Sequence, residues 1–325
     1  MKEILKVVRW KNLLIVAVTM IMTRYLLLAS LAAEMQVTLH TGETVQAALQ
    51  MPWFDFLFLV VATLCLTAGG YVINDYFDIK TDLINRGNVI VGTVIPRRRA
   101  MLMHNYLNLI GVAAGFYVSW RVGYFWLGTL FLLVSGLLWF YSASYKRQFL
   151  IGNILVALLT ALVPILVVFF EFPYIYEYYS MNATEHPYYN LLFFWTGGFA
   201  LFAFLTTLAR EIIKDIEDYE GDREYGRNTL PVVLGIRSTR VIVTGLVIGI
   251  IIMLYIVWGL FVNDLLTLVY MSLAIVLPQL LIILMVLTGR GRKHFHTASS
   301  VMKIVMLSGL LYMVVVKIVL SSGIY

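Results

Sequence analysis

The sequence predicts an all-α, polytopic membrane protein, and three observations support this fold class. Hydrophobic residues make up 61% of the chain and charged residues only 13%, with a mean hydropathy of +0.87, far from the composition of a soluble domain. Apolar stretches of about 17–25 residues, long enough to cross a bilayer core of about 30 Å, recur along the chain. Because backbone polar groups in lipid must be satisfied within their own segment, we expect these stretches to be helices.

Nine such stretches follow one another, separated by polar or basic residues. The first begins after a basic N-terminal tail, the second ends at "NDYFDIKTD", and the sixth ends at Arg210. The longest polar stretch between them, 210–237, is too short for a soluble domain, so residues 1–325 are expected to form a single membrane domain. The expected spans are 13–33, 53–73, 102–120, 122–141, 153–170, 191–209, 238–262, 265–287 and 299–320.

The N-terminal segment has a second interpretation. Residues 2–11 are basic, 13–23 are apolar, and "ASLAA" resembles a cleavage site, as in a secretory signal peptide. Its removal would upset the charge distribution described next, so we favour a retained first helix.

The basic residues predict the orientation of the chain. When the gaps between spans are assigned alternately to the two sides, all but four of the 24 Lys and Arg residues fall on the side of the N-terminal tail. Lys and Arg stay preferentially in the cytoplasm, so we expect a cytoplasmic N-terminus in a plasma or inner membrane. The net charge of +6 then reflects topology, and no nucleic-acid partner is expected.

Two acidic motifs share one spacing. Asp75, Asp78 and Asp82 follow the second span, and Asp215, Asp218 and Asp222 follow the sixth, both on the expected cytoplasmic side. On a helix, Asn74, Asp78 and Asp82 would lie on one face, as would Lys214, Asp218 and Asp222; Asp75 and Asp215 lie one residue off that face. A solvated loop could explain one such motif, but two in matching positions indicate a functional site.

The chemistry of these motifs points to a divalent cation. Carboxylates alone repel one another, and several converging oxygen ligands favour Mg²⁺, which completes its coordination with water and phosphate oxygens. Two facing motifs could hold two such ions with a diphosphate between them. Nearby bases that could balance the remaining charge are Lys146, Arg147, Lys214, Arg210 and Arg86.

The sequence resembles the UbiA superfamily of intramembrane prenyltransferases over essentially its whole length. The matching segments, in family order, are "NDYFDIKTDLINR", "VGTVIPRRRA", "YSASYKRQFLIGN" and "REIIKDIEDYEGDREYGRNTLPVVLG". The chain departs from the family pattern at Gly87, where many members have proline.

The resemblance implies a helical bundle around a central cavity that opens laterally to lipid, with Mg²⁺ on the diphosphate of a polyprenyl donor. By that analogy the catalytic and metal-binding residues are Asn74, Asp78, Asp82, Asp218 and Asp222. Lys146 is similar to the family's diphosphate-binding lysine, with Tyr141 in the same motif, and "RWKN" is similar to the R-x-x-N start that would place Asn12 near the site. Arg24, inside the first span, would either snorkel or contact an anion in the cavity.

The expected reaction is Mg²⁺-dependent transfer of a polyprenyl group to a lipophilic acceptor in the membrane. The phrase "KDIEDYEGDREYGRNTLPVVLG" is most similar to the ether-lipid branch, which adds geranylgeranyl to geranylgeranylglyceryl phosphate. Aromatic or quinone precursors of the 4-hydroxybenzoate, naphthoate or homogentisate type, and chlorophyllide, are alternative acceptors. Outside enzymes, an ion or anion transporter would also use paired acids, although transporters usually bind near the bilayer midplane. A non-catalytic lipid-binding scaffold is a further alternative, but it would not need every acid.

Overall fold

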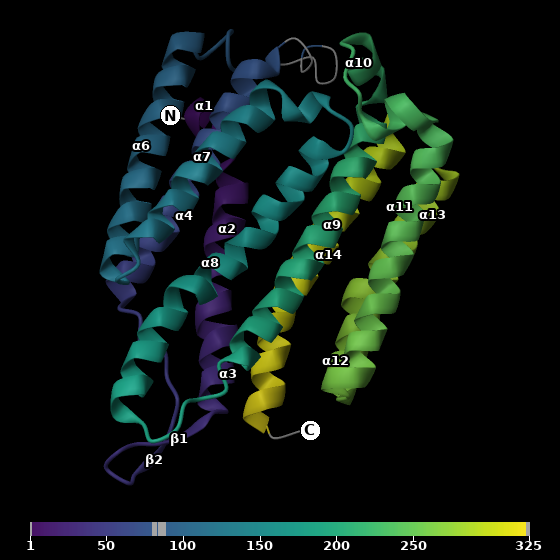
Figure 1. Ribbon diagram of the computed structural model, residues 1–325. Coiled ribbons are helices and arrows are strands. Elements are labelled where there is room, and N and C mark those ends of the chain that lie inside the picture. Colours follow the sequence, from purple (N-terminus) through teal and green to yellow (C-terminus); the bar gives the residue numbers. More distant parts are fainter. Residues whose placement is uncertain (1, 80–82, 84–88, 323–325) are drawn as a thin grey trace.

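The computed structural model describes residues 2–79, 83 and 89–322, and nearly all of them lie in long helices (Figure 1). The fold is all-α, as predicted, apart from a two-stranded antiparallel hairpin of β1 (Gln36–Thr38) and β2 (Thr44–Gln46). Among these described residues, eight helices are long and apolar enough to cross a membrane. The expected count of nine spans stays a prediction.

The N-terminal half of the chain supplies one group of helices. A continuous helical segment from Trp10 to Ala33 combines three elements, because α2 and α3 are joined by a π-helical stretch. The elements are α1 (Lys2–Val7), α2 (Trp10–Met22), η1 (Thr23–Leu28), α3 (Ala29–Ala33), α4 (Trp53–Phe77), α6 (Arg97–Arg121), η2 (Phe125–Leu127), α7 (Gly128–Ala143), η3 (Tyr145–Arg147) and α8 (Ile151–Asn182).

The C-terminal half supplies a second group that packs beside the first (Figure 1). Its elements are α9 (Asn190–Glu217), α10 (Tyr219–Glu224), α11 (Leu230–Val257), η4 (Trp258–Val262), α12 (Leu265–Tyr270), η5 (Met271–Val276), α13 (Leu277–Thr288) and α14 (Arg292–Ser322). Helices α9 and α14 join the groups, because each contributes to both of the larger apolar clusters: Leu192 and Met313 to one, Phe202 and Met302 to the other.

Helix α6 corresponds to the expected span 102–120, and it is the one long helix in the described residues that is not apolar enough to count as a membrane span. Two of its polar side chains, His104 and Asn108, form hydrogen bonds inside the bundle. Buried His104 bonds the Gly69 carbonyl of α4 at 2.9 Å, and Asn108 accepts from Ser135 of α7 at 2.6 Å. Gly111 allows α6 to approach α4 closely, because a Cβ there would lie 2.9 Å from Leu66.

Several helices extend beyond the apolar stretches seen in the sequence. The expected span 153–170 lies within α8, which continues to Asn182 through the aromatic-rich segment 171–180. Likewise α9 continues past 209 to Glu217. Helix α11 begins at Leu230, but its backbone is non-helical at Gly235 (φ 82°, ψ 156°), shortly before the expected start at 238. Helical hydrogen bonding does not require apolar side chains, so hydropathy marks the part of a helix in lipid and not its ends.

The two ends of the bundle differ in character (Figure 1). The N-terminal helix α1, the short helix α10 and the C-terminal ends of α4 and α9 lie at one end, and the β-hairpin lies at the other. Near the hairpin end, Arg24 donates to Glu171 at 2.9 Å, and both side chains are buried. Glu171 also accepts from the backbone N–H groups of Gln50 and Met51, at 2.8 and 2.9 Å.

We predict that Glu171→Ala destabilises the fold. The change leaves the buried Arg24 guanidinium without its carboxylate and two backbone donors without their acceptor, which should lower the free energy of unfolding by about 3–5 kcal/mol. Thermal unfolding of the purified protein in detergent measures this as a lower midpoint. Glu177→Ala, at an exposed site on the same helix, should leave the free energy of unfolding within about 0.5 kcal/mol of wild type. Equal shifts of the midpoint in both variants would contradict the assignment.

Candidate active site

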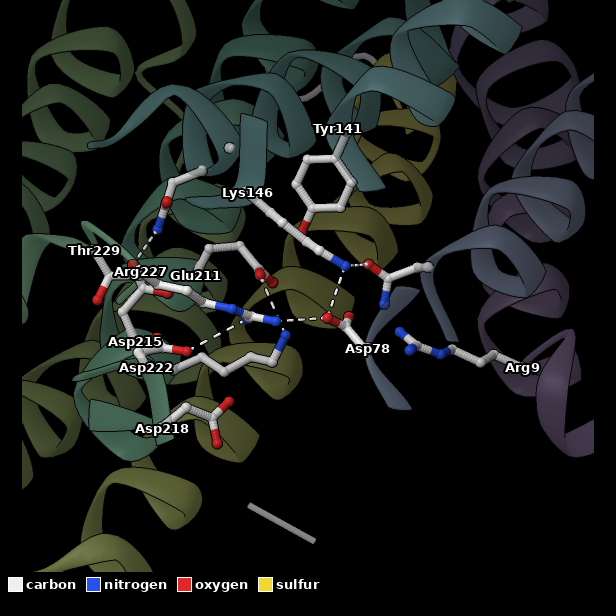
Figure 2. Close-up of a pocket in the computed structure, with 14 residues that line it drawn as sticks. Arg9, Asp78, Tyr141, Lys146, Glu211, Asp215, Asp218, Asp222, Arg227 and Thr229 are labelled. Atoms are coloured by element: carbon white, nitrogen blue, oxygen red, sulfur yellow. Dashed lines mark hydrogen bonds and ion pairs between the residues drawn. The ribbon is translucent and has the colours of Figure 1, made fainter. Parts of the chain in front are cut away.

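A polar pocket lies at the bundle end where α4 and α9 terminate (Figure 2). Helices α4, α7, α8 and α9, the turn η3, helix α10 and the segment that follows it all contribute side chains. The lining residues are Arg9, Asn74, Asp78, Tyr141, Lys146, Gly152, Asn153, Glu211, Lys214, Asp215, Asp218, Asp222, Arg227 and Thr229.

The two acidic motifs have the same local backbone geometry. Asp78 directly follows α4 with φ −90° and ψ 1°, and Asp218 directly follows α9 with φ −96° and ψ 9°. Each backbone N–H still bonds the carbonyl four residues earlier, Asn74 in one case and Lys214 in the other, at 3.0 and 2.9 Å. The expected continuous helical face is therefore interrupted at Asp218, where α9 gives way to α10, which carries Asp222.

A network of charged side chains joins the two motifs. Oδ1 of Asp78 accepts from Lys146 at 2.7 Å and from Arg227 at 2.6 Å. Arg227 also donates to Asp222 at 3.3 Å, so one guanidinium contacts both acidic motifs (Figure 2). Lys146 reaches Asn74 at 3.4 Å. Carboxylates that are far apart in the sequence thus face one pocket.

The environments of the two bridged carboxyls differ. Burial alone would raise the pKa of Asp78, but Lys146 and Arg227 hold that pKa below its usual range. At Asp222, burial raises the pKa to about 6; Asp218 adds to this effect, and Arg227 only partly opposes it. The negative charge of ionised Asp222 is thus only partly compensated by nearby positive charge, so this carboxyl is suited to bind a further cation.

The remaining acids of the pocket belong to α9. Asp215 accepts a hydrogen bond from Asn153 at 2.8 Å, so the start of α8 contacts the second acidic motif. Glu211 is buried and accepts from Arg210 at 2.5 Å and from Lys214 at 3.4 Å. Arg210 therefore acts on the pocket through Glu211, since it does not line the pocket itself.

Some expected residues lie outside the pocket. Arg147 is exposed, Asn12 contacts Tyr71 at 3.4 Å, and Asp75 pairs with Arg9 at 2.9 Å. Arg24 contacts Glu171 near the hairpin end, so it neither snorkels nor lines this pocket. Asp82 and Arg86 lie outside the described residues.

The structure adds six lining residues that sequence reasoning missed: Arg9, Gly152, Asn153, Glu211, Arg227 and Thr229. Arg9 begins the "RWKN" segment from which Asn12 was chosen, and Arg227 lies within the phrase "GRNTLP". The tendency of basic residues to stay on the cytoplasmic side would explain the occurrence of both arginines equally well. Only their contacts therefore distinguish them from the other basic residues of the chain.

The donor set of the pocket suits a hard cation shared with a ligand. In the described part of the chain, no group of three or more His, Cys, Asp or Glu side chains could hold a metal ion by itself. Carboxylate and amide oxygens nevertheless line the pocket beside Lys146 and Arg227. That combination fits Mg²⁺ with few protein ligands and with phosphate oxygens completing its coordination.

Comparison with known proteins identifies the family. The model of the UbiA prenyltransferase family matches residues 37–307. The chain belongs to the UbiA prenyltransferase family. A digeranylgeranylglyceryl phosphate synthase of Pyrococcus horikoshii is 34% identical over 187 residues, which cover 57% of this chain. The chain spans only 58% of the length of that relative.

Solved structures of UbiA homologues have the same fold. A structure described as giving insight into digeranylgeranylglyceryl phosphate synthase in membranes matches with a TM-score of 0.61 at 20% identity, covering 96% of this chain and 98% of that one. A UbiA homologue from Archaeoglobus fulgidus bound to GPP and Mg²⁺ matches with a TM-score of 0.54 at 14% identity, covering 96% and 99%. This membership and the likeness of fold confirm the resemblance and the membrane-embedded helical fold expected from the sequence.

Proposed function

We propose that this protein transfers a geranylgeranyl group from its diphosphate to the hydroxyl of a glycerol phosphate lipid, with Mg²⁺ as cofactor. The observation that carries the proposal is the Arg227 guanidinium between Asp78 and Asp222, because it brings both acidic motifs and Lys146 to one pocket. The acceptor is taken from the name of the Pyrococcus horikoshii relative, and Mg²⁺ with a prenyl diphosphate from the Archaeoglobus fulgidus homologue.

The charge of the pocket supports a diphosphate ligand. Five acids and four bases line it, which gives a formal net charge of −1. Two divalent cations would change this to +3, which matches the charge of about −3 on a diphosphate monoester near neutral pH. A transporter is less well supported, because both motifs lie where helices end rather than in an interrupted helix near the bilayer midplane.

The reaction breaks the bond between the allylic C1 and the diphosphate oxygen and forms an ether bond from C1 to the acceptor oxygen, whose proton is released. Lys146 and Arg227 are placed to bind and orient the diphosphate, on which negative charge increases as it departs. Mg²⁺, when bound, supplies further positive charge to the same group. Water has to be kept away from C1 during this step, because it would otherwise capture that carbon.

We predict that Asp78→Ala or Asp218→Ala lowers the rate of diphosphate release by about 10²–10³-fold, because each removes a carboxylate that would hold Mg²⁺ beside the negatively charged leaving group. Release of labelled diphosphate from the purified protein measures the rate, and membrane insertion is checked separately. Glu220→Ala is the matched control, since this exposed acid lies between Asp218 and Asp222. Wild-type turnover in both aspartate variants would refute the metal and diphosphate site.

We predict an ether product from geranylgeranyl diphosphate and geranylgeranylglyceryl phosphate. A panel of acceptors that also contains 4-hydroxybenzoate, a naphthoate, homogentisate and a chlorophyllide, analysed by mass spectrometry, tests the choice. If only an aromatic acceptor is prenylated, the protein is still a prenyltransferase, but the proposed glycerol phosphate acceptor is wrong.

We also propose that the pocket faces the cytoplasm, which is supported by the concentration of basic residues on one side of the sequence-derived spans. In a Cys65→Ala background, Arg223→Cys on α10 should react with a membrane-impermeant maleimide only after cells are permeabilised. Glu43→Cys in the hairpin should react from outside; both positions are exposed. The reverse labelling pattern would invert the topology.

A further inference from the structure

Arg227 occupies a distinctive place in the pocket. Its Nη2 atom lies 2.6 Å from Oδ1 of Asp78, and its Nη1 atom lies 3.3 Å from Oδ1 of Asp222 (Figure 2). Only 14% of its side chain is exposed, and both carboxylate partners are buried. The guanidinium therefore neutralises the same carboxylates that the proposed function assigns to metal binding.

The backbone around Arg227 is fixed in a way that supports this position. Gly226 has φ +64°, a left-handed conformation that glycine adopts without a Cβ penalty. The N–H of Arg227 then bonds the carbonyl of Asp222 at 2.9 Å, and the N–H of Asn228 bonds the carbonyl of Arg147 at 2.9 Å. The segment is thus held on one side to α10 and on the other to the turn that carries Lys146.

We propose that Arg227 holds the two acidic motifs together in the ligand-free protein and exchanges its carboxylate partners for the diphosphate when divalent cations bind. The inference rests on the proposed function, because it assumes that Asp78 and Asp222 bind those cations.

The exchange follows from competition for the same oxygen atoms. A divalent ion at Asp78 or Asp222 needs the lone pairs that now accept from Arg227, and positive charges on one carboxylate repel each other. Asp78 keeps Lys146 as a partner at 2.7 Å when Arg227 leaves. A displaced guanidinium in a mostly buried pocket needs a new anion, and a diphosphate accepts from its planar fork in bidentate fashion.

This arrangement couples the two ligands. Metal binding without diphosphate takes Asp78 and Asp222 away from Arg227, whereas metal binding with diphosphate supplies an anion in their place. Each ligand should therefore increase the affinity for the other, and by linkage the two increases are equal.

The coupling is measured with Mn²⁺ and inorganic diphosphate as probes. The purified full-length protein in detergent is titrated with Mn²⁺, with and without diphosphate, and free Mn²⁺ is followed by electron paramagnetic resonance. Because Arg227→Gln removes the competing charge, it should bind Mn²⁺ alone roughly tenfold more tightly than wild type and bind diphosphate in the presence of Mn²⁺ roughly tenfold more weakly. The ratio of Mn²⁺ affinities with and without diphosphate should therefore fall.

Two further variants complete the test. Arg223→Gln removes the same charge from an exposed position four residues away and should leave both affinities at their wild-type values. Arg227→Lys keeps the charge but cannot donate to Asp78 and Asp222 from one planar group, so its coupling should lie between wild type and Arg227→Gln. If Arg227→Gln does not fold, Arg227→Lys alone tests whether the coupling is weaker than in wild type.

The outcomes separate the inference from the function it rests on. Wild-type coupling in the Arg227 variants, or weaker Mn²⁺ binding without diphosphate, overturns the role of Arg227 while prenyl transfer stands. A wild-type protein that binds no Mn²⁺ even with diphosphate overturns the Mg²⁺-dependent function and the inference together.

Discussion

The pairing of the Asp78 carboxylate with Lys146 and Arg227 is the interaction on which the site depends. A buried carboxylate is costly without cations at contact distance, and here Lys146 comes from the turn after α7 and Arg227 from the segment after α10. Since Asp78 itself follows α4, one side chain fixes the relative positions of three parts of the chain. The packing of the helices and the electrostatics of the pocket are thereby linked.

The local geometry at Asp78 and Asp218 explains why the acids are available to a ligand. Each follows the last helical residue, with its N–H bonded to the turn before it. Glu211, which lies earlier on α9, also lines the pocket, but Arg210 and Lys214 already donate to its carboxylate. The end of a long helix places the carboxylate where polar and apolar surroundings meet.

The helical membrane fold and the two acidic motifs could be predicted from the sequence, because hydropathy and residue spacing are properties of the chain itself. The matching spacing joins Asp75, Asp78 and Asp82 in one motif and Asp215, Asp218 and Asp222 in the other. What could not be predicted depends on contacts between distant segments. Arg24 and Glu171 are 147 positions apart, and nothing local indicates that they pair. The role of Arg227 likewise requires the left-handed Gly226 and the turn at Lys146, neither of which spacing reveals.

The hairpin end of the bundle is fastened differently from the pocket end. Glu171 ties Arg24 and the residues before α4 to α8, and the Tyr179 hydroxyl accepts from the Ala48 N–H at 2.9 Å. Thr38 and Thr184 bond across the same region. The segment η1, the residues before α4 and helix α8 therefore share an anchored base, and any change of tilt about that base would displace the opposite tips, where Asp78 lies, the most.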